Sequence, residues 1–270
     1  RSGLFFNFNG TAGMWRRACL EDVGGWSGAT LTEDLELSYR AQMSGWRGVY
    51  RDDVRAPAEL PGTLRALEVQ QERWTRGGMQ TARRVLPELW RSGRRLAVKL
   101  EATAHLSGHV LHPLTLLLAL ALAWPGRLGG AAALVPGWVH GAAVAFAVLP
   151  FLLYYGAAAV LRGDGPLRAV PRVLEAVALG IGLGPPLAAA AVRGLTDRAA
   201  GTFRRTPKAG SGDARRLLER YGIGSPGARP LRTAVRAVLG IALLAAGAGV
   251  LASGSAAGAL FTLLFASGYL

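Results

Sequence analysis

The sequence changes character near residue 103, and this change limits what the chain can fold into. From Arg1 to about Thr103 charged and apolar residues are mixed, with sixteen Lys or Arg and twelve Asp or Glu. Beyond that point run long stretches of Ala, Leu, Val and Gly, which hold only five of the 17 acidic residues. A helix needs about 20 apolar residues to cross a bilayer. We therefore expect a soluble segment, 1–103, followed by a membrane segment, 104–270.

The overall charge and composition agree with a membrane protein. The formal net charge is +14, while 51% of the residues are hydrophobic and only 18% are charged. This combination favours basic surfaces beside a lipid bilayer over a nucleic-acid partner. The single cysteine, Cys19, excludes an internal disulfide, and we expect it to be a buried structural residue. Because the chain begins with Arg and opens on sequence typical of mid-domain, we expect a fragment that lacks an N-terminal part.

The soluble segment carries both strand and helix signals. The apolar run "LFFNF" and the later "RGVYRDDVRA" favour strands, and Trp15 to Val23 favours a helix that ends at Gly24-Gly25. A second helix follows Thr32, because Leu31, Leu35, Tyr39 and Met43 recur every four residues. These signals predict an α/β fold.

Two carboxylates begin the second helix. Thr30 and Thr32 can both cap this helix. Thr30 and Glu33 fit the S/T-x-x-E capping box, so Glu33 is explained as a cap. Asp34 is not needed for the box, and an Asp where a helix begins beside a strand end is also where α/β domains place chemistry. Capping and catalysis both remain open for Asp34 on spacing alone.

A polar group follows on the next predicted helix. Gln70, Arg73 and Trp74 stand at i, i+3 and i+4, so they share one face. A guanidinium can hold a diphosphate, and an indole can stack on a sugar ring. The alternative is an interfacial amphipathic helix that turns Trp74 and several arginines toward acidic lipid. These arginines are Arg73, Arg76, Arg83 and Arg84.

The second segment contains several apolar runs. We predict membrane spans at about 105–124, 138–161, 235–251 and 256–270. The run 173–192 contains Gly184-Pro185-Pro186 and has basic flanks on both sides, so we predict an interfacial or re-entrant element there. Positive charge is concentrated in the loops that would share a side with residues 1–103, which predicts a cytoplasmic soluble segment. Three histidines, His105, His109 and His112, share a helical face and favour packing over a metal site.

Three motifs then carry a resemblance. "FNGTAG", "TED" and "QQERW" occur in this order before membrane helices, and together they resemble the catalytic second half of family 2 processive glycosyltransferases. The similarity is to the cellulose-synthase-like enzymes, and within them to the glucomannan (mannan) synthase branch. The resemblance implies the second half of a GT-A nucleotide-sugar transferase domain, followed by a helical membrane domain.

The resemblance also implies site residues. Asp34 of the TED motif corresponds to the general base, with Glu33 secondary. Acceptor and diphosphate binding falls to Gln70, Arg73, Trp74, Asn9, Gly10 and Thr11. The stretch 201–210, "GTFRRTPKAG", is similar to the family's F-x-V-T-x-K gating loop, with Phe203, Thr206 and Lys208 in matching places. Arg205 stands where the family has Val, which puts that contact in doubt.

The family binds Mg²⁺ or Mn²⁺ through a D-x-D motif. No D-x-D occurs in this sequence, so the ligands are expected in a missing N-terminal part and no metal residue is assigned here. The function implied is an inverting, multi-pass glycosyltransferase of the cell membrane, with the fragment alone expected to be inactive. It would move a sugar from a nucleotide-sugar, GDP-mannose or UDP-glucose, to a growing β-linked glycan. The alternatives are a non-processive enzyme that forms a glycolipid, and an inactive membrane remnant.

Overall fold

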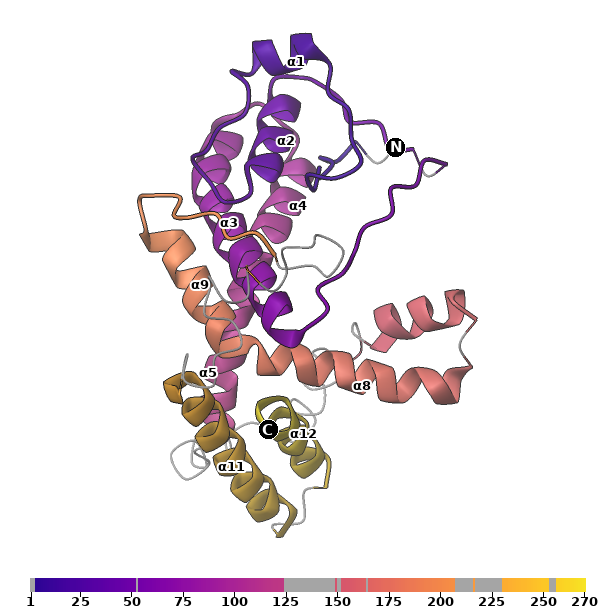
Figure 1. The fold of residues 1–270 in the computed structure, drawn as a ribbon, viewed down its shortest axis with the longest axis vertical. Helices are drawn as coiled ribbons and strands as arrows, with labels where there is room; N and C mark the ends of the chain where they lie inside the picture. The colour runs from indigo at the N-terminus through magenta and orange to yellow at the C-terminus, as the bar shows by residue number, and fades with distance from the viewer. Residues whose placement is uncertain are drawn as a thin grey trace. The chain divides into compact units, whose positions relative to one another are not determined.

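The computed structural model describes residues 3–51, 53–123, 149, 152–163, 165–206, 216, 230–252 and 256–270 (Figure 1). The chain divides into two compact units. The first comprises residues 1–113 and 186–228, and the second comprises 114–185 and 229–270.

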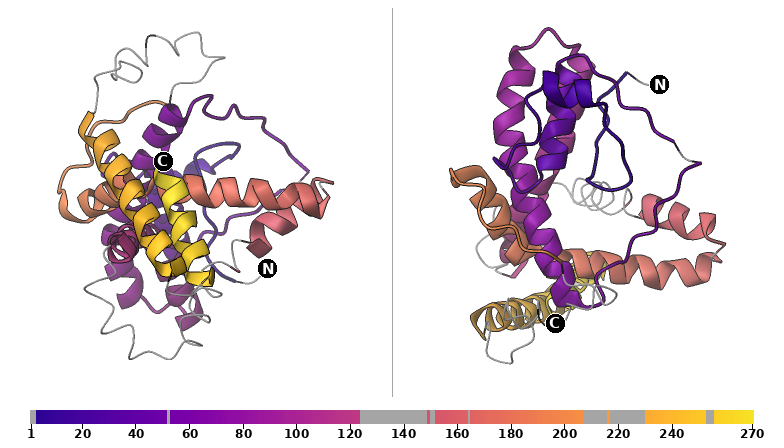
Figure 2. Two further views of the ribbon diagram at one scale, coloured as in Figure 1. Left: turned by 90° about the horizontal axis from the view of Figure 1, so that it is seen from below. Right: turned by 45° about the horizontal axis from the view of Figure 1, so that its top comes forward.

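The first unit is built around one long helix. Its elements are α1 (Arg17–Asp22), α2 (Glu33–Met43), α3 (Leu64–Arg91), α4 (Leu96–Ser107), a 3-10 turn (Gly108–Val110) and most of α9 (Gly184–Thr196). Helices α2 and α4 both pack on α3 (Figures 1 and 2). Their shared core consists of Tyr39, Ala82, Val85, Leu89, Val98, Ala102 and Leu106. Thr63 begins α3 as its N-cap, since its hydroxyl accepts a hydrogen bond from the backbone N–H of Ala66.

The predicted α/β fold, the second half of a GT-A domain, is wrong for the described residues, which form helices and no strand. The run 4–8 is extended, but side chains of α2 take its backbone groups. Gln42 accepts from Phe6 N at 2.6 Å, and its amide donates to Phe6 O at 2.7 Å. Ser38 Oγ accepts from Phe8 N at 3.1 Å. A strand needs a neighbouring backbone to pair with, and here a helix meets that need instead.

The apolar stripe predicted for α2 is confirmed. Leu31 and Tyr39 are buried, and Leu35 and Met43 pack against the core around Tyr39. Of the two candidate caps, Thr32 is the N-cap residue, and within the described structure its side chain makes no capping hydrogen bond. Its hydroxyl lies 3.2 Å from the Thr81 hydroxyl of α3 instead. Contact between the two helices therefore takes the hydroxyl that could have capped α2.

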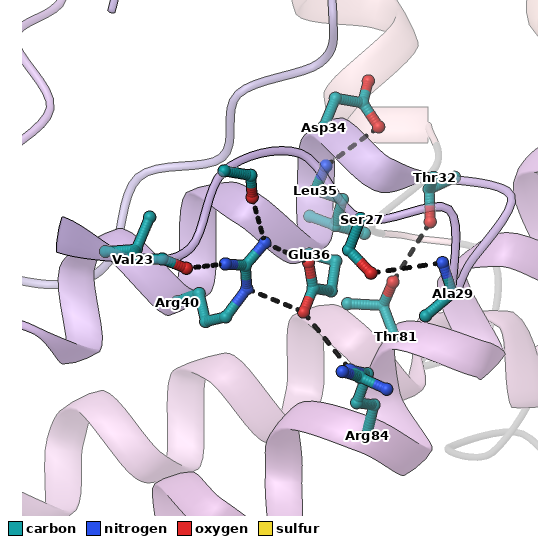
Figure 3. Close-up of polar contacts among 11 residues, drawn as sticks. Val23, Ser27, Ala29, Thr32, Asp34, Leu35, Glu36, Arg40, Thr81 and Arg84 are labelled. Atoms are coloured by element: carbon teal, nitrogen blue, oxygen red, sulfur yellow. Dashed lines mark hydrogen bonds and ion pairs between the residues drawn. The ribbon is translucent and has the colours of Figure 1, made fainter. Parts of the chain in front are cut away.

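A buried carboxylate ties α2 to its surroundings (Figure 3). Glu36 is only 1% exposed. Its oxygens lie 2.8 Å from Arg40 Nη2 and 3.3 Å from Arg84 Nε on α3. Arg40 also donates to the carbonyls of Val23 and Gly25, so the turn before α2 joins the same network. One carboxylate thus links α2, α3 and the 23–25 turn.

The second unit contains α5 (Leu111–Ala123, from Leu114 on), a helix at Leu152–Leu161, α8 (Pro166–Gly182), α11 (Pro230–Ala252) and α12 (Ala256–Tyr269). Helices α11 and α12 lie side by side (Figure 2). The core of this unit consists of Ala119, Ile181, Leu239, Leu243, Phe265, Ala266 and Tyr269. Gly268 allows α12 to approach α8 closely, because a Cβ there would lie 2.6 Å from the carbonyl oxygen of Ala178.

Within the described residues, two helices are long and apolar enough to cross a membrane. They are Leu96–Ala123 and Thr233–Ala252, and a third exists if α8 and α9, separated by a break, form one span. The predicted spans 105–124 and 235–251 fall on the first two, while 256–270 falls on a shorter apolar helix. Most of the predicted span 138–161 lies outside the described residues. Which helices cross a bilayer remains a prediction.

The Glu36 network gives a stability prediction. Replacing Glu36 with Ala leaves Arg40 and Arg84 without their shared carboxylate, so the free energy of unfolding should fall by about 3–5 kcal/mol. The matched control is Glu21→Ala, which removes another Arg–Glu pair at i and i+4 whose side chains are 92% and 62% exposed. That change should lower stability by at most about 1 kcal/mol. Chemical denaturation of the detergent-solubilised protein would measure both, and equal losses would contradict a special role for Glu36.

A candidate active site at the start of helix α2

Asp34 lies in the first turn of α2 and is half-buried. Its Oδ1 accepts a hydrogen bond from the backbone N–H of Leu35 at 2.8 Å, and its side chain points away from the Glu36 network (Figure 3). Its Oδ2 faces Gly10, where a Cβ would lie only 2.5 Å away. Gly10 also has a φ of +77°, a conformation that favours glycine. The predicted 9–11 segment therefore does lie against the predicted base.

Helix α3 positions the segment that leads into Asp34. Gly77 presents no side chain to Thr32, because a Cβ there would lie 2.8 Å from the backbone nitrogen of Thr32. One turn later, Gln80 accepts a hydrogen bond from the backbone N–H of Leu31 at 3.0 Å. Residues 31–32 are thus held by close packing and by a buried amide.

Arg73 carries a positive charge that interacts with the two carboxylates at the start of α2. Burial lowers the pKa of its guanidinium, and the negative charges of Glu33 and Asp34 oppose that shift. The guanidinium carbon lies 4.5 Å from the centre of the Phe203 ring. Arg73 Nε is buried and has no hydrogen-bond partner among the residues that the structure describes. A partly buried guanidinium is suited to bind an anion such as a phosphate.

The loop after α9 is fastened to α3 by three side chains. Arg76 Nη2 lies 2.8 Å from a carboxylate oxygen of Asp197. Arg83 donates to the carbonyls of Leu195 and Asp197 at 2.7 and 2.6 Å. Gln80 donates to the carbonyls of Ala199 and Ala200 at 3.3 and 3.0 Å. The loop that carries Phe203 therefore runs along the α3 face that also holds the start of α2.

Between this loop and the start of α2 lies a pocket of about 260 Å³. Its lining includes the Trp26 ring, Thr30, Glu33 and Phe203. Trp26 is half exposed, and the Thr30 hydroxyl is buried without a hydrogen-bond partner. The pocket thus offers an aromatic face, a hydroxyl and a carboxylate, which are groups that can contact a sugar. A larger cavity of about 710 Å³ lies around the C-terminal end of α2, and no predicted site residue lines it.

The structure brings some of the predicted residues together and leaves others apart. Glu33, Asp34, Gly10, Arg73 and Phe203 converge at the start of α2. Gln70 and Trp74 lie on α3 beside Arg73, with Trp74 43% exposed. Asn9 and Thr11 contact each other at 3.5 Å. Thr206 is buried with an unpaired hydroxyl, and Lys208 lies outside the described residues.

The sequence interpretation missed the residues that fasten the loop. One alternative turned Arg76, Arg83 and Arg84 toward acidic lipid. Instead, Arg76 binds Asp197, Arg83 binds the carbonyl of Leu195, and Arg84 contacts Glu36. Gln80 and Asp197 were not singled out. A signal was present, because Arg76, Gln80 and Arg83 stand at i, i+4 and i+7 on one helical face.

The described residues do not provide a site for a divalent metal. In these parts of the chain no three His, Cys, Asp or Glu side chains cluster as metal ligands would. The described residues therefore do not fit the expected Mg²⁺ or Mn²⁺. Of the three histidines, His105 Nδ1 lies 2.7 Å from the Tyr39 hydroxyl, and the rings of His109 and His112 stack 5.8 Å apart.

Comparison with known proteins decides the family. Residues 2–161 match the family model described as glycosyl transferase family group 2. The chain belongs to this family. This membership confirms the resemblance inferred from the three motifs. The matched residues cover most of the first unit, including the segment around Asp34 and the whole of α3.

Individual relatives give a more specific comparison than the family model. Over 85 residues the chain is 45% identical to the probable glucomannan 4-beta-mannosyltransferase 11 of Oryza sativa subsp. japonica, which is 32% of this chain and 15% of the relative. Over 88 residues it is 43% identical to the glucomannan 4-beta-mannosyltransferase 2 of Arabidopsis thaliana, which is 33% of this chain and 16% of the relative. The chain therefore matches about one sixth of these relatives' length. No solved structure matches it.

The close approach at Gly77 gives a second prediction. Alanine favours a helix over glycine by about 1 kcal/mol, yet Gly77→Ala should destabilise the protein by about 1–3 kcal/mol, because its methyl group would meet the backbone of Thr32. Gly180→Ala in α8 is the matched control, since a Cβ there meets nothing within 4 Å. It should stabilise the protein by about 0.5–1 kcal/mol. Thermal unfolding would compare the two, and a stabilising Gly77→Ala would rule out the contact.

Proposed function

We propose that this protein is a membrane-embedded, inverting glycosyltransferase that transfers a sugar from a nucleotide-sugar to a growing β-linked polysaccharide. Family membership supports glycosyl transfer. The observation that carries the proposal is the placement of Asp34, whose Oδ2 has no hydrogen-bond partner in the described chain, near the half-buried guanidinium of Arg73. A base for the acceptor and a cation for the leaving group are the two elements that such a transfer needs from the protein.

The proposed step is a single displacement. Asp34 accepts the proton of an acceptor hydroxyl while the oxygen of that hydroxyl attacks the anomeric carbon of the donor sugar. The bond between this carbon and the nucleoside diphosphate breaks, and the electron pair leaves with the diphosphate. Attack from the side opposite the leaving group inverts the configuration. Arg73 stabilises the charge that grows on the diphosphate.

The remaining predicted residues have roles around this centre. Gln70 and Trp74 would shape the acceptor end together with the 9–11 segment. Phe203, Thr206 and Lys208 would act as the loop that covers the nucleotide. The names of the plant relatives favour GDP-mannose over UDP-glucose as donor. A glycan end would be the acceptor.

We further propose that the protein is multi-pass and that the Asp34 site faces the cytoplasm, where nucleotide-sugars are found. Two apolar helices are long enough to cross a bilayer. The first follows Arg94 and Arg95, and Lys99 lies over the ring of Trp90 at 5.9 Å. Basic and indole side chains at the start of an apolar helix are typical of the cytoplasmic membrane interface.

The base assignment is tested by Asp34→Asn in the protein expressed from its whole gene. The amide keeps the shape of the side chain but cannot accept the proton, so turnover should fall by about 10²–10⁴-fold while nucleotide binding stays nearly unchanged. Glu33→Gln is the control, since it removes the neighbouring charge and leaves Asp34. Radiolabelled sugar transfer into polymer and into lipid extracts would measure both, and it also separates a polysaccharide from a glycolipid product. Near-normal turnover by Asp34→Asn would exclude the proposed mechanism.

The orientation is tested with single cysteines in a Cys19→Ser background. The stretch 125–137 carries one Lys or Arg, whereas 193–232 carries ten, so these stretches should lie on opposite sides of the membrane. An impermeant thiol reagent applied to intact cells should label Gly130→Cys and leave Thr202→Cys unlabelled until the cells are opened. Labelling of Thr202→Cys from outside would place the α3-bound loop away from cytoplasmic nucleotide and contradict the proposal.

A further inference from the structure

Gln80 is the described residue whose side chain bonds both the start of α2 and the loop after α9. It is 2% exposed. Its Oε1 accepts from the N–H of Leu31 at 3.0 Å, and its Nε2 donates to the carbonyls of Ala199 and Ala200. We propose that Gln80 is a positioning residue that couples the base-bearing segment 31–34 to the loop 199–203. This inference rests on the proposed function for its catalytic consequences.

The hydrogen bonds at position 80 require an amide side chain. One backbone segment offers an N–H and the other offers two carbonyls, so the side chain between them must accept and donate at the same time. Asn and Gln are the side chains that carry both an amide acceptor and an amide donor, and Asn is one methylene shorter. Because Leu31 is buried, its N–H would lose water without regaining a hydrogen bond if the amide were removed. Ala199 is exposed, and its carbonyl also accepts from Arg76 Nη2 at 3.5 Å.

Both ends of this coupling lead to groups in the candidate site. On one side, Leu31 precedes Asp34 by three residues. On the other side, Phe203 follows Ala200 by three residues and lies over Arg73, which stands two turns before Gln80 on the same face of α3. A shift of the Gln80 amide therefore moves the base and the covering loop relative to Arg73.

The neighbouring side chains hold the loop alone. Arg76 bonds Asp197, and Arg83 bonds the carbonyls of Leu195 and Asp197. In the described structure neither has a bond to residues 31–34. If Gln80 only filled space, an apolar side chain of the same length would replace it. If it couples the two segments, changing its donor and changing its acceptor should have different effects.

The test uses Gln80→Glu, Gln80→Met and the control Gln71→Glu in the protein expressed from its whole gene, reconstituted in lipid nanodiscs. At pH 8 the Gln80→Glu carboxylate can still accept from Leu31 but repels the two carbonyls. We expect faster hydrogen exchange in the 199–206 loop and a donor KM raised at least about ten-fold, with kcat changed much less. Gln80→Met loses all three hydrogen bonds, so kcat should fall as well, by about 10–100-fold. Gln71→Glu adds the same charge on the same helix and should leave loop exchange unchanged.

A pH series separates positioning from general damage. Lowering the pH from 8 to 6 moves the carboxyl introduced by Gln80→Glu toward its protonated form, which can donate to a carbonyl again. The donor KM of Gln80→Glu relative to wild type at the same pH should therefore fall toward one, while that of Gln80→Met stays constant.

Three results would overturn the inference. These are unchanged loop exchange in Gln80→Glu, equal effects of Gln71→Glu and Gln80→Glu, and faster loop exchange with no change in KM or kcat. Hydrogen exchange does not depend on catalysis. If Asp34→Asn kept its turnover, the proposed mechanism would fail while the structural coupling could still be measured.

Discussion

The site depends on the contact between the start of α2 and the face of α3 around Gly77. Thr32 approaches the α3 backbone so closely that only a residue without a side chain fits beneath it. This contact sets the distance between the start of α2, which carries Asp34, and helix α3. Arg73 lies one turn before Gly77 on α3. Because close-packed elements adopt discrete arrangements rather than sliding freely, the distance between the base and the guanidinium is set by packing rather than by a direct bond.

The Glu36 network restrains the orientation of α2 relative to α3. The contact of Gly77 with Thr32 fixes one end of α2, and a helix held at one end alone could still rotate about that contact. Glu36, one turn into α2, adds ion pairs to Arg84 on α3 and to Arg40, which holds the 23–25 turn. Buried ion pairs add little net stability compared with apolar packing, but they are sensitive to geometry. We attribute to Glu36 the role of selecting one orientation of α2.

The sequence predicted the local grouping of residues better than the architecture. The stripe from Leu31 to Met43 follows from spacing, and the grouping of Asp34 with Arg73 follows from the motifs. The α/β fold failed because an apolar run such as 4–8 shows a preference for extended backbone but not the identity of its partner, and here Ser38 and Gln42 of α2 take that place. Thr32 makes no capping hydrogen bond in the described structure because its hydroxyl contacts Thr81, 49 residues away. Interactions between distant segments decided both cases.

The arrangement also explains how a carboxylate and a guanidinium can remain useful side by side. Under the proposed function, a salt bridge between Asp34 and Arg73 would occupy the oxygen that would take a proton and the guanidinium that would hold a phosphate. Within the described structure they form no such bridge, although their charges influence each other. Phe203 covers one face of Arg73, and the backbone N–H of Leu35 holds one oxygen of Asp34. Each group is therefore restrained through its own neighbours, and within the described structure Asp34 Oδ2 carries no hydrogen bond. Gln80 links the segment before Asp34 to the loop that carries Phe203, so under the proposed function it would keep the base and the covering loop in register.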